Sequence, residues 1–438
     1  MQIFLTILLP LLALLCLWRS HATNKRRRLI GNLPTSKTQG VFIGLVELKG
    51  TAECEVPVQS FLAEASCVHY SYSVSERWER EVVEEYTDEE GRTQTRTRTE
   101  SGWTTVLSGG ESTPFYLQDD TGVVLVRPEG AEIRPLNLFN ATVGPGDPLY
   151  YGKGPGGAVM DSTFVRTFSE SGIPLHHPLF VVGQARERED VVAPELAHEK
   201  SNPLYLLTVE SEEQVLRGMG WKLHLLNILG LLFAGGAACA IAAAMSPSHR
   251  VPNPWWPTAL IGVGVYLAVW FVTWFFLVFN MLVDVRNRMR QGWSSLEVQL
   301  KRRFDLIPGL VAAAEGLRSH ERETQESIAA MRAELAAGAG LSTEARHRGV
   351  ANNIVTLAER YPELQANAGF QNLQAQLIDT EQRIALARAY FNDIATAYNT
   401  RLEIMPDGLI ARLFGHARQP LLETEEFERA TVKVNLAE

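Results

Sequence analysis

The sequence predicts a multi-domain membrane protein with a strand-rich (α+β) domain, three transmembrane helices and an all-α antiparallel helical bundle. Three long uncharged apolar stretches predict the spans, because a charge at the centre of a bilayer costs roughly 2.5–3.5 kcal/mol on insertion scales. Alternating strand-forming residues fill the region between the first and second stretch. After the third stretch, apolar residues recur at helical spacing.

The charged residues avoid these apolar stretches. The 438 residues carry a net charge of -9, and all 50 acidic residues lie within 30–216 or 284–438. The first segment holds 29 acidic and 14 basic residues, and the second holds 21 acidic and 19 basic residues. Because an acidic surface repels a phosphate backbone, we expect no nucleic-acid partner.

Residues 1–18 predict an N-terminal transmembrane anchor. Ile3 to Trp18 are almost all Leu and Ile, and helix of this length spans ~24 Å of a ~30 Å hydrocarbon core. Arg19 and the basic run 25–28 follow the stretch, which places its C-terminal end in the cytoplasm. A cleaved signal peptide is the alternative, although such a peptide carries its positive charge first.

Residues 30–216 predict the strand-rich domain, on the cytoplasmic side. Turn sequences at 88–91 (DEEG) and 119–122 (DDTG) predict hairpins, and Gly109-Gly110 predicts a third break. The charged strands around 76–100 are either a long solvated hairpin or a docking surface. At the end of the domain, SEEQ at 211–214 has the pattern of a capping box, which starts a helix toward the second span.

Two further spans are predicted at 223–245 and 258–283. The first is rich in Gly and Ala at four-residue spacing, which lets transmembrane helices approach closely. Lys and Arg are retained on the cytoplasmic side of membranes. We therefore expect the N-terminus outside, 19–222 inside, the short connection outside and 284–438 inside.

One continuous helix is predicted to leave the third span and begin a bundle over 284–415, followed by an extended tail over 416–438. Its apolar residues recur at steps of three and four, which predicts one buried face: Val285, Met289, Trp293, Leu296, Leu300 and Phe304. Pro308 is expected to end this helix. Further helices are expected over 310–335, from about 342 to 361, over 370–405 and over 409–415.

Polar residues in the bundle suggest two roles. Lys301, Arg302 and Arg303 form the notable basic cluster and are the candidate membrane or partner surface. They lie ~27 Å of helix beyond the membrane exit, more than a Debye length of roughly 8 Å, so ion pairs with acids of neighbouring helices are the favoured interpretation. Asn392 and Asn399, seven residues apart, would fix the register between helices if buried.

Little in the sequence points to catalysis. It contains no GxxxxGK[ST], GxSxG or HExxH motif. GKGPGG at 152–157 indicates a surface loop more than a phosphate site, and His176-His177 has no located carboxylate partner for a metal. A disulfide between Cys54 and Cys67 would need an oxidising compartment. We expect no catalytic residue, no metal ion and no cofactor.

Two family resemblances add to this interpretation. The segments RNRMRQGWSSLEVQLKRRFDLIPGLV (286–311), FQNLQAQLIDTEQRIALARAYFNDIATAYN (370–399) and MPDGLIARLFG (405–415) resemble the LemA family. That resemblance implies a membrane-tethered antiparallel helical bundle with no established catalytic activity. The segments TPFYLQDDTGVVLVRPEGAEI (113–133) and ESGIPLHHPLFVVGQA (170–185) are similar to the GIDE-type domain of mitochondrial membrane-anchored E3 ubiquitin ligases.

The GIDE resemblance does not extend to the ligases' catalytic part. Those ligases act through a zinc-bearing RING after the second span, where this chain has the LemA-like region. Only Cys54 and Cys67 lie outside the apolar stretches, too few for a RING. We therefore expect an integral membrane scaffold with the lipid bilayer and an unidentified protein as partners, able to form homo-oligomers through its spans and bundle. The alternative is a ligase-type enzyme or adaptor for protein modification.

Overall fold

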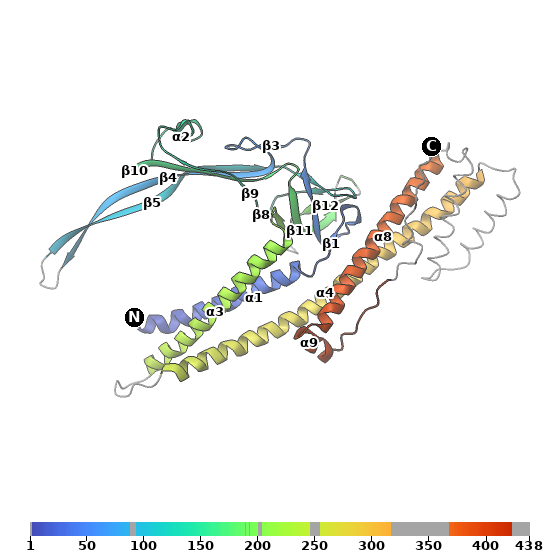
Figure 1. Ribbon diagram of the computed structural model, residues 1–438. Helices are drawn as coiled ribbons and strands as arrows, with labels where there is room; N and C mark the ends of the chain where they lie inside the picture. Colours follow the sequence, from blue (N-terminus) through green and yellow to red (C-terminus); the bar gives the residue numbers. More distant parts are fainter. Residues whose placement is uncertain are drawn as a thin grey trace, which may run out of the picture. The chain divides into compact units, whose positions relative to one another are not determined.

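The computed structural model describes residues 2–87, 93–188, 190–191, 193–199, 204–245, 255–316 and 368–422. The chain divides into two compact units: the strand unit, residues 35–217, and the helical unit, residues 1–34 and 218–438. The predicted strand-rich region and helical C-terminal part are both confirmed (Figure 1). The helix expected over 342–361, most of that over 310–335, and the tail beyond Leu422 lie outside the described residues.

A small closed barrel forms the core of the strand unit. Strands pair in the order β1-β2-β6-β7-β12-β11-β13-β8, and β2 pairs with both β6 and β11, so five strands close into a ring. Inward-facing side chains such as Val46, Leu48 and Phe115 are fully buried. The bounds are β1 Thr35–Ser36, β2 Gly44–Glu53, β6 Phe115–Gln118, β7 Val123–Val126, β8 Glu132–Arg134, β11 Pro178–Glu187, β12 Pro194–Ala197 and β13 Leu206–Thr208.

A second sheet is built around one long strand. β4 (Ser66–Thr87) pairs antiparallel with β5 (Thr93–Ser112) and β10 (Ser162–Pro174), and β10 pairs with β9 (Leu136–Val143). β3 (Val58–Gln59) pairs with the start of β4. Short helices complete the unit, η1 over Thr38–Gly40 and α2 over Pro148–Gly152. The hairpin predicted around 88–91 is confirmed, because Thr87 pairs with Thr93, although its turn lies outside the described residues.

The other two predicted breaks have opposite outcomes. At 119–122 the turn is confirmed: the Asp119 carboxylate accepts hydrogen bonds from the backbone of Thr121 and Gly122. The break at Gly109-Gly110 is wrong, because both glycines continue β5. A Cβ at Gly109 would lie 2.9 Å from the Tyr72 ring, so glycine there provides room for a cross-strand aromatic side chain.

In the described part of the helical unit, three helices are long and apolar enough to cross a membrane. They are α1 (Gln2–Ile30), α3 (Glu212–Met245, begun in the strand unit) and the first part of α4 (Trp255–Gly316). The capping box that starts α3 is confirmed, since Ser211 and Gln214 exchange hydrogen bonds between side chain and backbone. Helix α1 continues past the predicted end of the anchor at residue 18 as far as Ile30.

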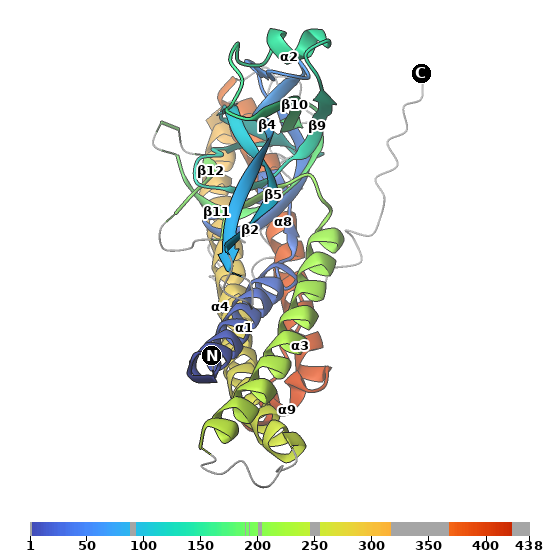
Figure 2. The ribbon, with the colours of Figure 1, turned by 90° about the vertical axis from the view of Figure 1, so that its left-hand side faces the viewer.

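These three helices pack with alternating direction. Ser20 of α1 donates to Asn227 of α3, and Arg27 lies beside Gly220, so α1 and α3 are antiparallel. A Cβ at Gly262 of α4 would overlap the carbonyl oxygen of Ala234 in α3, which places small residues at the closest approach of α3 and α4. Figure 2 shows the three helices running beside one another.

The bundle pairs the second half of α4 with α8 (Ala368–Glu403). Trp293 stacks edge-on against Phe391, and Arg303 lies opposite Glu381, so the two helices are antiparallel. A short helix, α9 (Asp407–Leu413), follows α8. Helix α4 is continuous over 62 residues, which confirms that one helix joins the third apolar stretch to the bundle.

The predicted end of this helix at Pro308 is wrong, because α4 continues to Gly316. A proline removes one intrahelical hydrogen bond and costs ~3 kcal/mol. Ile307 and Leu310, on either side of it, are fully buried and offset that cost. The predicted apolar face also shifts: Phe304 is 40% exposed, and Arg303 takes the buried position.

Candidate functional site

The strand unit carries a polar cluster in which residues from its two chain ends, Thr35 and Glu212, surround the middle of β2. Thr35, which follows α1 in sequence, donates to the Glu47 carboxylate at 2.7 Å. The Lys49 ammonium lies 3.5 Å from Glu47 and 2.8 Å from Glu212, in the first turn of α3. Glu47 is fully buried, and this burial raises its pKa to about 7. We call Thr35, Glu47, Lys49 and Glu212 the tether cluster.

The hairpin β4–β5 extends beyond the rest of its sheet. β10 ends its pairing at Trp78, and the Glu79 N–H still donates to the Asp161 carbonyl, so from Arg80 onward β4 pairs only with β5 among the described residues, and Figure 1 shows the two strands continuing alone. One face of this two-stranded ribbon carries Glu79, Glu81, Val83 and Glu85, opposite Ser101 and Thr residues. These four β4 side chains are exposed. An isolated two-stranded ribbon is marginally stable in water.

One sequence candidate for chemistry in this unit, the glycine-rich loop 152–157, has a structural explanation. The loop 152–157 is held by Arg166, whose guanidinium donates to the carbonyl oxygens of Pro155 and Gly157 and pairs with buried Glu76 at 3.0 Å. Lys153 bonds to the Phe61 carbonyl and to Glu64 instead of facing an empty cradle. The loop is therefore a structural feature of the fold.

The histidine and cysteine candidates are also placed. His176 is 77% exposed in its side chain and lies 2.7 Å from Glu53. Within the described ranges, no group of three or more His, Cys, Asp or Glu side chains is arranged to hold a metal ion. Cys54 and Cys67 are free thiols, and burial raises the pKa of Cys67 to about 11, which disfavours the reactive thiolate.

The basic cluster of the bundle faces α8. Arg303 is 1% exposed and lies 3.3 Å from Glu381, while Arg302 lies 3.7 Å from Asp379. Lys301 is exposed. The structure thus places Arg303 inside the helix interface and leaves Lys301 and Arg302 at the surface.

A second polar cluster joins α1 to the end of the bundle at which α8 finishes. Asp407, only 2% exposed, lies 3.1 Å from Arg28 of α1 and 3.5 Å from Arg401 of α8. Arg401 also donates to Asn32, 2.8 Å away. Burial lowers the pKa of Arg401, while Asp407 opposes that shift. This cluster fixes the end of α1 beside the turn between α8 and α9.

Asn392 and Asn399 bind an extended segment rather than another helix. The Asn399 amide donates to the Gln419 carbonyl and accepts from the Gln419 backbone N–H. Asn392 makes the same pair of bonds with Leu422. Seven residues of helix rise ~10 Å, as do three residues of extended chain, so the spacing of the two asparagines fits a strand lying along α8.

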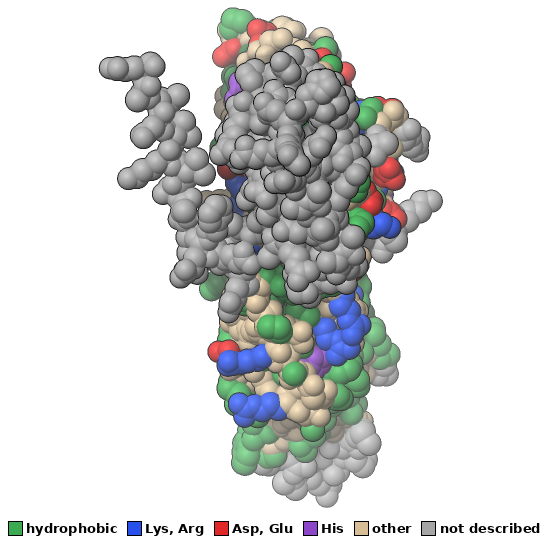
Figure 3. Space-filling view, turned by 90° about the vertical axis from the view of Figure 1, so that its right-hand side faces the viewer, with side chains coloured by type: hydrophobic (Ala, Val, Ile, Leu, Met, Phe, Trp, Pro, Cys, Tyr) green, Lys and Arg blue, Asp and Glu red, His purple; other side chains and the backbone are tan. Residues whose placement is uncertain are grey.

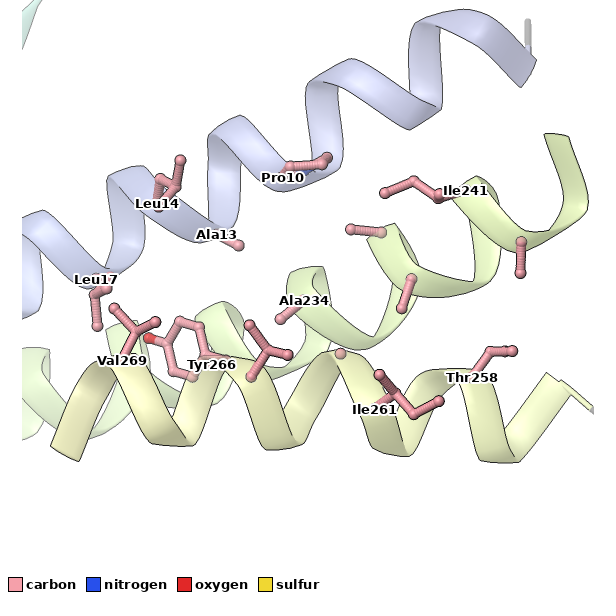
Figure 4. A pocket seen from close by; sticks show the side chains of 15 residues that line it. Pro10, Ala13, Leu14, Leu17, Ala234, Ile241, Thr258, Ile261, Tyr266 and Val269 are labelled. Carbon is pink, nitrogen blue, oxygen red and sulfur yellow. The ribbon is translucent and has the colours of Figure 1, made fainter. Parts of the chain in front are cut away.

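An apolar cavity of about 570 Å³ lies among α1, α3 and α4. Figure 4 shows Leu17 of α1 and Tyr266 and Val269 of α4 on facing walls. Its lining is almost entirely aliphatic apart from Thr258 and Tyr266, which suits an acyl chain.

Two family models match the chain. Residues 292–436 match the LemA family, and residues 83–241 match the GIDE family, whose description is E3 ubiquitin ligase. Both resemblances seen in the sequence are therefore confirmed. Magnetosome protein MamQ of Magnetospirillum gryphiswaldense is 24% identical over 189 residues, which cover 36% of this chain and 70% of the relative. With three helices able to span a bilayer, these matches indicate a membrane-associated protein.

Sequence reasoning missed the tether cluster and Asp407. Glu47 and Lys49 alternate with the inward-facing Val46 and Leu48 like ordinary surface charges, and only the tertiary structure shows that Glu47 is buried beside Thr35. Asp407 could have been recognised from the sequence, because an acid in the first turn of a helix such as α9 is a candidate partner for basic residues at the end of another helix.

Proposed function

We propose that the protein is an integral membrane scaffold that binds a partner through its GIDE-type region and organises or bends membrane through its LemA region. The observation that carries this proposal is α4, a helix whose first part is apolar and outward-facing and whose second part packs on α8. In the first part, exposed side chains include Leu260, Ile261, Phe271 and Phe276. Apolar exposure on this scale is what a lipid environment accommodates.

The proposed topology places 19–222 and 284–438 together in the cytoplasm. The packing of the spans supports a shared side, because Arg27 of α1 lies near Gly220 of α3, and Arg28 contacts Met281 of α4 at 3.5 Å. The end of α1, the start of the apolar part of α3 and the exit of α4 are therefore at one level. The basic residues at 25–28 and at 286, 288 and 290 support the cytoplasm as that side.

The partner surface that we propose is the face of the β4–β5 ribbon that carries Glu79, Glu81 and Glu85. Its row of glutamates faces solvent, and its open strand edges can pair with another strand. A basic extended segment is the chemistry that complements it. For Lys301, Arg302 and Arg303 we propose a role in steadying the bundle through α8, with Lys301 and Arg302 left to contact a partner.

A membrane extraction test addresses this proposal. Membranes from cells expressing the full chain are washed at alkaline pH and then treated with protease from the outside. We expect the chain to stay in the membrane pellet and both units to resist external protease. Release by the wash would refute membrane integration, and external digestion of 30–216 would refute the topology.

A ligase-type role in protein modification is the second candidate function, because the model matching 83–241 is described as an E3 ubiquitin ligase. The four cysteines of the sequence are too few for a RING, so such a role would act through an associated protein. Incubating the detergent-solubilised chain with ubiquitin, its activating enzyme and a conjugating enzyme tests it. Ubiquitin transfer that depends on the chain would favour this function over the scaffold.

A further inference from the structure

The turn between α8 and α9 carries an unusual set of exposed apolar side chains. Ile404, Met405, Leu409, Leu413 and Phe414 are each between 45% and 72% exposed. We call these five residues the apolar corner. The opposite side of α9 is packed, with Ile410 and Ala411 buried. Helix α9 therefore has one apolar face turned inward and another turned outward.

The position of the corner along α4 decides what surrounds it. The ring centroid of Phe414 lies 4.5 Å from that of Phe279 and 6.1 Å from that of Phe275. Both residues belong to the uncharged stretch 258–283. At 1.5 Å per residue they lie ~6 Å and ~12 Å before Val283, where that stretch ends. The corner is thus level with the last turns of the third span.

Neighbouring charges suit a lipid headgroup region. Arg412 and Arg418 are exposed on either side of Phe414, and Arg418 pairs at 2.6 Å with Glu403, an exposed acid directly before the corner. Such long side chains can reach the interface while their stems lie along apolar surface. The face in Figure 3 shows Lys and Arg side chains among apolar ones. The buried Asp407, beside the corner, is paired with Arg28 and Arg401. Interfacial helices lie ~5–10 Å into the headgroup and acyl boundary, which matches this depth.

Hydrogen bonds from α8 hold the segment that follows the apolar corner. The Tyr398 hydroxyl lies 2.9 Å from Nδ1 of His416, and Asn392 and Asn399 fix the extended segment that follows. Helix α8 therefore presents the corner to its surroundings as a rigid element.

We propose that the apolar corner inserts into the bilayer leaflet at which α4 emerges, as a shallow membrane contact in addition to the three spans. The occupant of this surface is lipid, because the apolar surface of the corner continues that of α4, where Phe276 is 58% exposed. Insertion into one leaflet only is the geometry that spreads headgroups on that side. This inference rests on the proposed function and names the element through which the bundle acts on the membrane.

Photolabelling of the full chain in liposomes tests the inference. Phosphatidylcholine with a diazirine in its acyl chain is irradiated, and labelled peptides are mapped by mass spectrometry. We expect label on 255–283 and on 404–414, and a loss of at least five-fold at the corner in the variant Leu409→Asp/Leu413→Asp. Val298→Asp, at a 60% exposed position farther along α4, is the matched control and should leave both labels unchanged.

The outcomes separate the two proposals. Label on 255–283 without label on 404–414 overturns the apolar corner and leaves the scaffold in place. Absence of label from 255–283 overturns membrane integration itself. Corner label that persists in the double variant also overturns the inference, because it would not depend on the apolar side chains.

Discussion

The tether cluster makes the stability of the strand unit depend on pH. Glu47 ionises with a pKa of about 7 in the folded chain, against an ordinary value of 4.5. The unfolded chain therefore releases this proton more readily, and unfolding becomes easier as pH rises from 4.5 to 7. Since one pKa unit corresponds to 1.36 kcal/mol, the ionised Glu47 costs the fold about 3 kcal/mol above pH 7.

Glu47→Gln removes that cost while keeping an acceptor for the Thr35 hydroxyl. At pH 8 we expect the variant to be more stable than the parent by about 3 kcal/mol, which raises the melting temperature of a unit of this size by roughly 6–12 °C. At pH 4.5 we expect the two proteins to be nearly equally stable. The assay is thermal unfolding of the full chain in detergent, followed by near-ultraviolet circular dichroism between pH 4.5 and 9. Glu213→Gln, an exposed neighbour of the cluster, is the control and should show no pH-dependent gain. A difference between Glu47→Gln and parent that is constant across this pH range would refute the reasoning.

Three further variants probe the helical unit. Asp407→Asn leaves the guanidinium groups of Arg28 and Arg401 without their buried carboxylate. Breaking a buried ion pair costs about 3–5 kcal/mol, so calorimetry should show a lower melting temperature. An unchanged melting temperature would contradict the pairing. Gly262→Leu forces a side chain against the Ala234 carbonyl and should abolish a cysteine crosslink engineered between α3 and α4, which a conservative Val265→Leu should preserve. Asn392→Ala with Asn399→Ala removes four hydrogen bonds to the tail and should raise amide exchange at Gln419 and Leu422 by at least ten-fold; unchanged exchange would show that other contacts hold the tail.

Periodicity predicted the elements whose environment is uniform along their length. The three apolar helices, the capping box at Ser211 and the long helix α8 all follow from local spacing. The closed barrel did not, because its closure depends on β2 pairing with β11, which are more than a hundred residues apart. No local pattern encodes that pairing.

The errors share a physical cause, which is tertiary packing that overrides a local preference. Pro308 disfavours helix by itself, but the burial of Ile307 and Leu310 keeps α4 intact. For Arg303 the favoured interpretation was an ion pair with a neighbouring helix, and it does pair with Glu381 on α8, but its nearly complete burial follows only from the packing of these two helices. Gly109 suggested a break between strands, but it lies within β5, where the absence of a side chain leaves room for the Tyr72 ring on the neighbouring strand.

The central claim is that α4 crosses a bilayer and continues, as one helix, into the bundle that it forms with α8. Electron paramagnetic resonance of single spin labels placed in turn from residue 258 to residue 300, in bilayers containing the full chain, measures it directly. We expect high oxygen accessibility and low accessibility to a water-soluble nickel complex up to Val283, then a reversal, with a 3.6-residue period throughout. Labels between 260 and 280 that the nickel complex reaches freely, or a loss of the helical period near 284, would contradict the account.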